Sequence, residues 1–257
     1  MKIVVISVII LASSISCLNK VSASPSLIES KSTQITENFI QNQVQKNNSV
    51  GLTVKSIVNH YPQQSAAIVS TTLDLYPDKY KEIIHSAISA QPALAQEVVT
   101  IAISKGITSC SSIVETAINA DPSYVDFVVT AAASTTPGEL NEIVRIAVIT
   151  EPDSADYIVQ SLAKEHPSKI VEILSTAIGA VPLVGEYVVE ALLAAFPNDA
   201  EQVVTTAVRE SAAKRENVIK IIEAAYNSGI TSEDLGSYAI NGGATQEEVA
   251  EVLSIKD

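Results

Sequence analysis

The chain has few of the residues that build metal-bound or nucleotide-binding sites. Its 257 residues include two cysteines, three histidines, nine glycines and no tryptophan. It lacks a glycine-rich phosphate loop, a Gly-x-Ser-x-Gly sequence, zinc-type pairs of Cys or His, and an Asp-rich loop with calcium-ligand spacing. We therefore predict a protein that is not an enzyme and that has no catalytic residue, no cofactor and no metal site.

Basic residues are also scarce. The chain has 16 Lys and Arg against 29 Asp and Glu, a formal net charge of −13. An acidic surface repels nucleic-acid phosphates and anionic lipids, so neither is expected as a partner. One basic cluster is interleaved with glutamates and is interpreted as a solvated, salt-bridged face. Its basic members are Arg209, Lys214, Arg215 and Lys220.

A long apolar run occurs at the N-terminus. Lys2 is followed by apolar residues 3–12 and then by the small-residue sequence 21–23. This order predicts a signal peptide over residues 1–23, cleaved after Ala23, and an exported protein that is periplasmic, cell-surface or secreted. The run is shorter than the roughly 20 residues that span a bilayer. No later segment approaches that length, so no integral membrane segment is expected in the mature chain.

Cleavage would leave one cysteine. Cys110 alone cannot form an intrachain disulfide, so the fold must depend on packing. The removed Cys17 offers an alternative, a lipid anchor, although Ser14 stands where the bacterial lipoprotein pattern has an aliphatic residue. The three histidines are not spaced as ligands of a shared metal and are interpreted as solvent-facing or turn residues. They are His60, His85 and His166.

The chain does contain a regular series of prolines. Nine of its ten prolines lie at positions 62, 77, 92, 122, 137, 152, 167, 182 and 197. Every gap is fifteen residues except the thirty-residue gap between 92 and 122, where Ile107 occupies the missing place. Such a fixed spacing indicates an internal repeat.

Each fifteen-residue block, counted from its proline, has apolar or small residues at positions four, seven, eight, eleven and twelve. In one block these residues are Ala155, Ile158, Val159, Leu162 and Ala163. This is the stripe of an amphipathic helix. The Val and Ile pairs at positions seven and eight would also suit a β-solenoid, but the polar residues do not alternate as strands require. We predict one helix of about twelve residues per block, with proline at the first helical position, where its missing N–H costs nothing.

A thirty-residue period is superimposed on the fifteen-residue one. In the six blocks that start at residues 122 to 197, the sixth position is alternately aromatic and polar. These residues are Phe127, Tyr157 and Tyr187 on one side, and Glu142, Glu172 and Gln202 on the other. The unit is therefore a helical hairpin with antiparallel neighbours. The aromatic residues are interpreted as packing between helices, with a peptide-binding groove as the alternative.

The two ends depart from the repeat. Residues 24–46 are polar and weakly periodic and are expected to form a leader and a weak N-terminal cap. Residues 227–257 are expected to form short capping helices. Helix N-caps are predicted at several places from Ser, Thr or Asp ahead of a helical pattern. The predicted capping residues are Asp121, Thr136 with Glu139, Thr231 with Asp234, and Thr245 with Glu248.

Together these patterns predict an all-α fold, an α-solenoid of about twelve repeats over residues 47–226. In architecture it resembles the broad class of tetratricopeptide-like and HEAT-like superhelices. A tetratricopeptide unit has about 34 residues and a signature of Trp, Leu-Gly and Tyr, and this chain has neither. No specific family is indicated.

The resemblance implies an extended surface for a partner. We expect a non-enzymatic scaffold that binds a protein or peptide whose identity the sequence does not give. One alternative is a structural surface protein that associates with itself. Another is an amphipathic lipid-surface binder, although the basic flanks typical of exchangeable apolipoproteins are missing.

Overall fold

The computed structural model describes residues 37–256, which belong to one compact unit. The predicted signal peptide, Cys17 and the leader up to residue 36 lie outside the described residues. Within the described range all regular structure is helical and no strand is present. The β-solenoid alternative is therefore wrong for this part of the chain.

Twelve α-helices follow one another over the predicted repeat region. They are α2 (Val50–His60), α3 (Ser65–Leu75), α4 (Tyr80–Ala90), α5 (Ala95–Ser104), α6 (Cys110–Ala120), α7 (Val125–Thr135), α8 (Leu140–Thr150), α9 (Ala155–Glu165), α10 (Ile170–Ala180), α11 (Gly185–Ala195), α12 (Ala200–Ser211) and α13 (Arg215–Asn227). A helix over residues 37–47 precedes them. The helices α14 (Ser232–Gly242) and α15 (Gln246–Lys256) follow them.

Each of the nine regularly spaced prolines begins a single turn of 3₁₀ helix that leads into the next α-helix. These turns are η1 (Pro62–Gln64), η2 (Pro77–Lys79), η3 (Pro92–Leu94), η4 (Pro122–Tyr124), η5 (Pro137–Glu139), η6 (Pro152–Ser154), η7 (Pro167–Lys169), η8 (Pro182–Val184) and η9 (Pro197–Asp199). At one junction the His166 N–H donates to the Leu162 carbonyl at 2.9 Å, and the Lys169 N–H donates to the His166 carbonyl at 2.8 Å. Proline has no N–H, and it therefore occupies a position where no hydrogen-bond donor is needed.

The junction that lacks a proline is built differently. Helix α5 ends at Ser104, and Gly106 follows with φ +60°, a left-handed conformation that glycine adopts without a steric penalty. Ser109 then caps α6, because its hydroxyl oxygen accepts from the Ser112 N–H at 3.3 Å. A glycine and a serine thus replace the turn that a proline at position 107 would have started.

Three of the predicted N-caps are confirmed. A carboxylate oxygen of Asp121 accepts from the backbone N–H of Ser123 at 3.1 Å. The hydroxyls of Thr231 and Thr245 each accept from the N–H three residues later at 3.2 Å. The carboxylate of Glu248 also accepts from the Thr245 N–H at 2.7 Å, which completes a capping box.

The predicted cap at Thr136 is wrong. Its side chain makes no capping bond to the following turn. The hydroxyl instead donates to the Ala132 carbonyl at 2.9 Å, at the end of the preceding helix. Threonine hydroxyls commonly bond back to the carbonyl four residues earlier, and at this junction that bond competes successfully with the cap.

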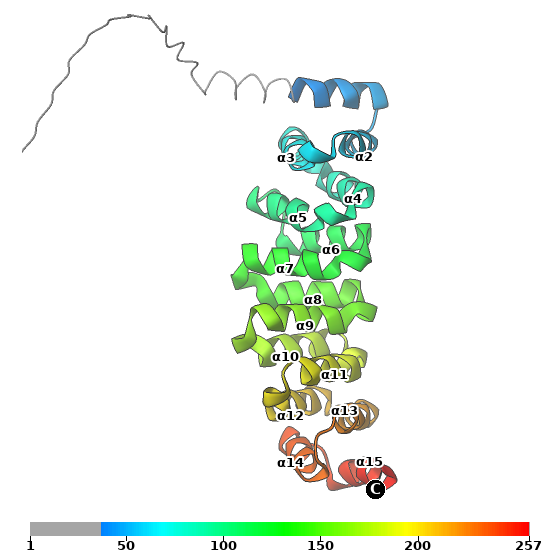
Figure 1. The fold of residues 1–257 in the computed structure, drawn as a ribbon, viewed down its shortest axis with the longest axis vertical. Helices are drawn as coiled ribbons and strands as arrows, with labels where there is room; N and C mark the ends of the chain where they lie inside the picture. Colours follow the sequence, from blue (N-terminus) through cyan, green and yellow to red (C-terminus); the bar gives the residue numbers. More distant parts are fainter. Residues whose placement is uncertain (1–36, 257) are drawn as a thin grey trace, which may run out of the picture. The chain divides into compact units, whose positions relative to one another are not determined.

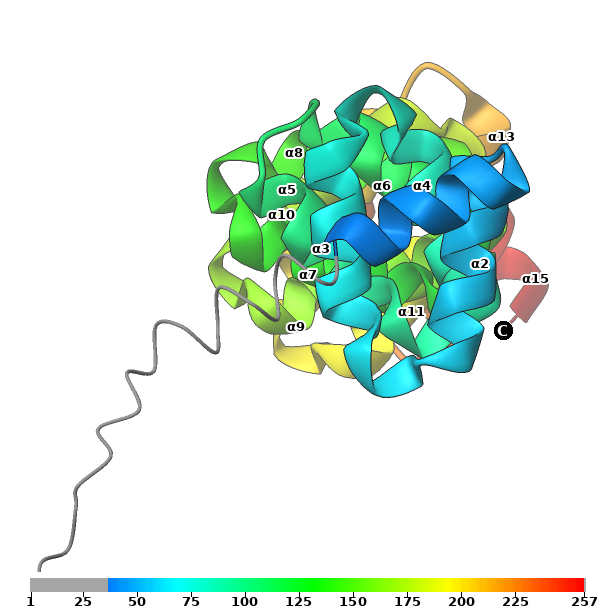
Figure 2. The ribbon, with the colours of Figure 1, turned by 90° about the horizontal axis from the view of Figure 1, so that it is seen from above.

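The helices form two layers, which we call the even layer and the odd layer after their numbers. In each layer a helix packs on the next one of the same parity, α2 on α4 on α6 and α3 on α5 on α7, through to α14 and α15. Consecutive helices also pack across the layers in pairs (Figure 1). Viewed along the stack, α2 and α10 lie on opposite sides although both belong to the even layer, so successive pairs are turned relative to one another (Figure 2).

The predicted stripe forms the core. In α9 the buried residues are Ala155, Ile158, Val159, Leu162 and Ala163. The corresponding residues of the other helices join them in one apolar cluster that runs from residue 40 to residue 252. Burial of one such Ile or Leu side chain contributes about 1.5–3 kcal/mol. The core therefore explains why short helices are stable here, although helices of this length are marginal in isolation.

Helices of one layer are also joined by polar bonds. Six of these bonds link residues that are 31 positions apart, one more than the hairpin period, and toward the C-terminus the separation is larger, 35 for Ser175 with Glu210 and 33 for Thr205 with Tyr238. The six pairs that are 31 positions apart are Lys105 with Asp74, Ser89 with the Ala120 carbonyl, Ser111 with Glu142, Ser134 with Glu165, Asn141 with Glu172, and Gln160 with the Ala191 carbonyl. The thirty-residue unit thus has a direct structural basis.

Candidate functional site

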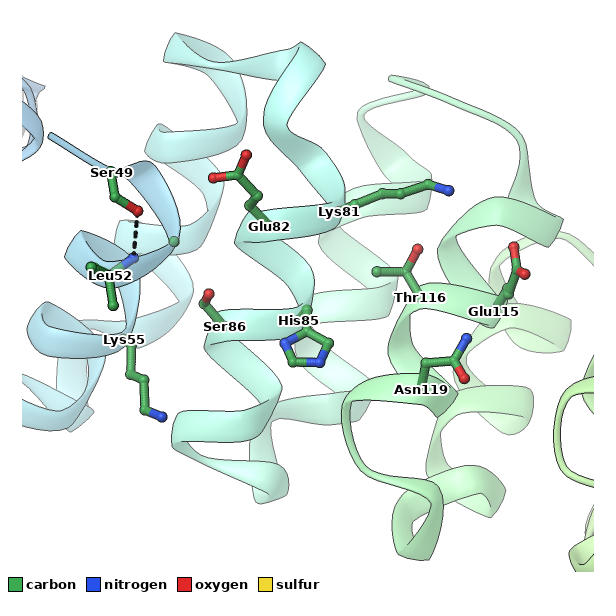
Figure 3. A pocket seen from close by; sticks show the side chains of 11 residues that line it. Ser49, Leu52, Lys55, Lys81, Glu82, His85, Ser86, Glu115, Thr116 and Asn119 are labelled. Atoms are coloured by element: carbon green, nitrogen blue, oxygen red, sulfur yellow. Dashed lines mark hydrogen bonds between the residues drawn. The ribbon is translucent and has the colours of Figure 1, made fainter.

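One candidate surface is a polar groove on the even layer, where α2, α4 and α6 lie side by side (Figure 3). It has a volume of about 560 Å³. Its lining residues are Ser49, Gly51, Leu52, Lys55, Lys81, Glu82, His85, Ser86, Glu115, Thr116 and Asn119. Charges of both signs meet in this groove, so it has no single electrostatic preference.

Several polar groups of the even-layer groove are already bonded within the chain. Glu82 forms an ion pair with Lys79 at 3.3 Å. His85 Nδ1 lies 3.4 Å from the hydroxyl oxygen of Ser89, and the same hydroxyl lies 3.3 Å from the Ala120 carbonyl, which it can reach as a donor. The serine nearest to the histidine is therefore engaged in linking α4 to α6, which indicates a structural contact.

The second candidate surface is on the odd layer and contains the three aromatic residues Phe127, Tyr157 and Tyr187, which we call the aromatic ladder. They occupy the same position on α7, α9 and α11, three helices that pack in succession. Their side chains are 46%, 64% and 60% exposed. The prediction that they pack between helices is wrong, and the surface alternative is the one that their exposure fits.

Helical geometry explains this exposure. At 100° per residue, the sixth position of a block lies about 180° from the centre of the buried stripe. An aromatic residue there must face away from the core in either layer. The alternation of aromatic and polar residues therefore marks the outer surfaces of two different layers. Adding 100° per residue along the sequence would have predicted that the aromatic residues are exposed.

Two hollows flank the aromatic ladder between α9 and α11. One of about 390 Å³ is lined by Asp156, Tyr157, Gln160, Tyr187, Glu190, Ala191 and Ala194. The other, of about 430 Å³, is lined by Pro152, Asp153, Ala155, Asp156, Val181, Leu183, Val184 and Tyr187. Both are lined by Asp156 and Tyr187, so they adjoin each other, and we call the two together the ladder groove. Leu183 adds an apolar side chain that is 70% exposed.

An acidic residue precedes each aromatic residue of the ladder. These carboxylates belong to Asp126, Asp156 and Glu186, and each is partly exposed. None of them takes part in an ion pair within the described residues. The ladder therefore combines exposed rings with carboxylates that form no ion pair among residues 37–256.

The corresponding surface of the even layer differs. Glu142 and Glu172 occupy the sixth position there, and each accepts a hydrogen bond from a basic side chain three residues away, Arg145 and Lys169 respectively, at 2.6 Å. The bond from Arg145 lowers the pKa of Glu142, and the bond from Lys169 lowers the pKa of Glu172. The carboxylates at these two sixth positions are thus paired with basic side chains of the chain.

The structure does not bring the three histidines together. His60 and His85 are exposed and lie on helices α2 and α4, and His166 is partly buried at the junction before η7. The Nε2 atom of His166 is buried and has no hydrogen-bond partner among residues 37–256. Within this range no group of His, Cys, Asp or Glu is arranged to hold a metal ion.

Cys110 lies at the start of α6 and is 5% exposed, as predicted from its apolar block position. Burial raises the pKa of its thiol, and its Sγ lies 3.4 Å from the hydroxyl of Thr136. These surroundings disfavour the reactive thiolate form. Cys110 therefore contributes to the core.

The predicted basic cluster is salt-bridged in part. Arg215 contacts Glu247 at 3.3 Å and Glu251 at 2.6 Å, which ties α13 to α15. Lys220 contacts Glu216 at 2.9 Å along α13.

No helix in the described part of the chain has both the length and the apolar character needed to cross a membrane. The comparisons with protein-family models, with curated proteins and with solved structures find no match to this chain.

Proposed function

We propose that this protein is a non-enzymatic scaffold that binds a protein or peptide along the odd layer, at the aromatic ladder. One observation carries the proposal, namely that Phe127, Tyr157 and Tyr187 are exposed at the same position of three successive helices. Single exposed aromatic side chains are common, but a row of them at the same position of successive helices, beside a groove, is typical of an interaction site. Tyrosine rings are also among the side chains most enriched in binding interfaces.

The finer architecture is part of the proposal. We infer an α-solenoid of the tetratricopeptide-like and HEAT-like superhelical kind, because hairpins of thirty residues stack and turn in succession. In such a repeat the same position of each unit forms a continuous line on the surface. The aromatic ladder lies on one such line.

The proposal also places the protein outside the cytoplasm, since the sequence begins with the signal-peptide pattern over residues 1–23. Mass spectrometry of the protein isolated from the cell that produces it tests this point. We expect an N-terminus at Ser24 in the periplasmic, surface or secreted fraction. An N-terminal Cys17 with an added lipid mass would support the anchored alternative, and an intact Met1 in the cytoplasm would contradict export.

A photo-crosslinking experiment tests the binding surface. The photoreactive residue p-benzoylphenylalanine is placed at Tyr157 in the odd layer or, as a matched control, at the exposed Gln202 in the even layer. Both residues occupy the sixth position of a block. On irradiation in the producing cell, we expect a discrete crosslinked partner from position 157 and none from position 202.

Two results would contradict the proposal. Equal crosslinking to the same protein from both positions would show that the odd layer is not the binding surface. A crosslinked product that contains only two copies of this chain would show self-association, the structural alternative. The exposed acidic residues of the ladder make that second result unexpected, because two copies would oppose like charges.

A further inference from the structure

The chemistry of the aromatic ladder narrows the class of partner, if the ladder is the binding surface proposed above. Each rung, by which we mean one aromatic residue and the acidic residue before it, presents a ring and a carboxylate on the same helix. The three rungs are Asp126 with Phe127, Asp156 with Tyr157, and Glu186 with Tyr187. A ring face attracts a Lys or Arg side chain within about 6 Å, and a carboxylate adds charge and a hydrogen-bond acceptor.

The helices that form the rungs contain little positive charge of their own. Between them, α7, α9, α11 and the turns η4, η6 and η8 have one basic residue, Lys164, whose Nζ donates to Gln160 at 2.7 Å. The same segments have six acidic residues. These are Asp126, Asp153, Asp156, Glu165, Glu186 and Glu190. The segments that form the rungs are therefore strongly acidic, with six acidic residues against one basic residue.

A lysine of the chain itself occupies the C-terminal end of the ladder. Lys220 on α13 bonds to Glu216, and this bond is the main cause of its raised pKa. Glu186 and Tyr187 lie close enough to raise the pKa of Lys220 further. The last rung thus stands next to one ammonium group, whereas no ion pair is present at the carboxylates of the two rungs before it, Asp126 and Asp156.

The spacing of the rungs sets the spacing of the ligand's charges. Packed helices lie about 8–10 Å apart. An extended or polyproline II chain rises about 3.1–3.4 Å per residue, so three residues span one helix-to-helix distance. A polyproline II chain also returns to the same face every third residue. Charges at every second residue would advance only about 6.5 Å and would fall out of step with the rungs.

We propose that the aromatic ladder binds a cationic segment in polyproline II conformation that carries Lys or Arg at every third residue, one for each rung. This inference rests on the proposed function and adds the chemical class of the partner. Other occupants fit less well. A neutral apolar segment would bury the three carboxylates without a counter-charge, which is unfavourable. An anionic segment or a second copy of this chain would be repelled.

Fluorescence anisotropy with synthetic peptides tests the charge and the spacing separately. Three labelled peptides of equal length are mixed with the full chain. One has Lys at every third residue, the second has the same number of Lys at every second residue, and the third has Glu at every third residue. We expect the first to bind at least about tenfold more tightly than the second, and we expect the third not to bind.

Matched protein variants locate the binding. We expect Asp156→Asn and Tyr157→Leu each to lower the affinity for the first peptide about two- to fivefold. The double variant Tyr157→Leu with Tyr187→Leu should lower it about tenfold. Glu172→Gln on the even layer serves as the control and should have no effect. All the altered side chains are at least partly exposed, and circular dichroism checks that each variant keeps the helical content of the parent.

The outcomes separate this inference from the proposed function. Equal affinity for the second- and third-residue spacings, binding of the Glu peptide, or an equal loss in Glu172→Gln would each overturn the inference. If no peptide binds but position 157 still crosslinks to a partner, the cationic ligand is wrong and the binding surface stands. If position 157 crosslinks to nothing, the proposed function itself fails.

Discussion

At the scale of single residues, the position within the fifteen-residue block determines burial. Ile158 is fully buried and the preceding Tyr157 is 64% exposed. Both are large and partly or wholly apolar, so hydrophobicity alone does not separate them. Their angular positions around α9 do, because one helical residue turns the side chain by 100°.

A second determinant of stability at this scale is how closely two helix backbones approach each other. Gly242 on α14 is buried, and a Cβ atom added there would lie 2.7 Å from the Cβ of Val208 and 2.8 Å from the Thr205 carbonyl oxygen. Neither atom can move without displacing α12. We expect Gly242→Ala to lower the free energy of unfolding by about 1–3 kcal/mol, measured by urea denaturation.

The matched control for this substitution is Gly179→Ala on α10. Gly179 is exposed, and an added Cβ there has no neighbour within 4 Å. Alanine is the better helix former, so we expect this change to raise stability by about 0.5–1 kcal/mol. Destabilisation of equal size at both positions would contradict the argument from close packing.

At the scale of the element, the helices depend on one another. Most have eleven residues, and isolated helices shorter than about 12–15 residues are marginal in water. Each is therefore held by its neighbours, which lie both in the same hairpin and thirty residues away. The polar bonds between residues 31 positions apart link each helix to particular neighbours in its own layer.

Deletions test whether the unit is fifteen or thirty residues. Removal of residues 152–181 eliminates α9 and α10 together and leaves every later helix in its own layer. Removal of residues 152–166 eliminates α9 alone and moves all later helices into the opposite layer. We expect the shorter deletion to be the more destabilising, by about 1–3 kcal/mol for each mismatched helix contact. The measurement is thermal denaturation followed by circular dichroism.

The deletion experiment has a clear negative outcome. If the two shortened proteins melt at the same temperature, the two layers are interchangeable and the polar bonds between helices of one layer do not set the unit. A third variant that lacks residues 152–165 is one residue short of the block and serves as a control for loss of the fifteen-residue period.

At the scale of the whole molecule, carboxylates that accept hydrogen bonds from basic side chains make the stability of the fold depend on pH. Glu142 and Glu172 on the even layer have their pKa lowered, first of all by hydrogen bonds from Arg145 and Lys169. Glu216 on α13 has its pKa lowered in the same way by Lys220. A carboxyl whose pKa is lower in the folded than in the unfolded chain stabilises the fold above its unfolded pKa, and this contribution is lost as the pH falls through its folded pKa.

We therefore expect the free energy of unfolding to decline in acid, below the ordinary pKa of a glutamate. The double variant Glu142→Gln with Glu172→Gln should show a shallower decline than the parent, since its two lowered pKa values are gone. Both side chains are largely solvated, so the difference is small. Urea denaturation at a series of pH values measures it, and identical acid dependence in the two proteins would contradict the assignment.

The sequence by itself determined the features that arise within one block. The period, the twelve helices of residues 50–227 and the buried stripe follow from the spacing of prolines and apolar residues. The caps at Asp121, Thr231 and Thr245 follow from side chains within three residues of the bonds they make. Such interactions are short-range along the chain, so a linear pattern contains them. The cap predicted at Thr136 is wrong because two local bonds compete for one hydroxyl.

Only the tertiary structure decided what depends on helices thirty residues apart. The 31-residue offset and the ladder groove between α9 and α11 both depend on how one helix is placed on the next. That placement results from packing between helices and is not contained in any single block. The sequence showed only that Tyr157 and Tyr187 alternate with polar residues. The fold was needed to show that these outward-facing rings lie on successive helices of one layer, beside a groove.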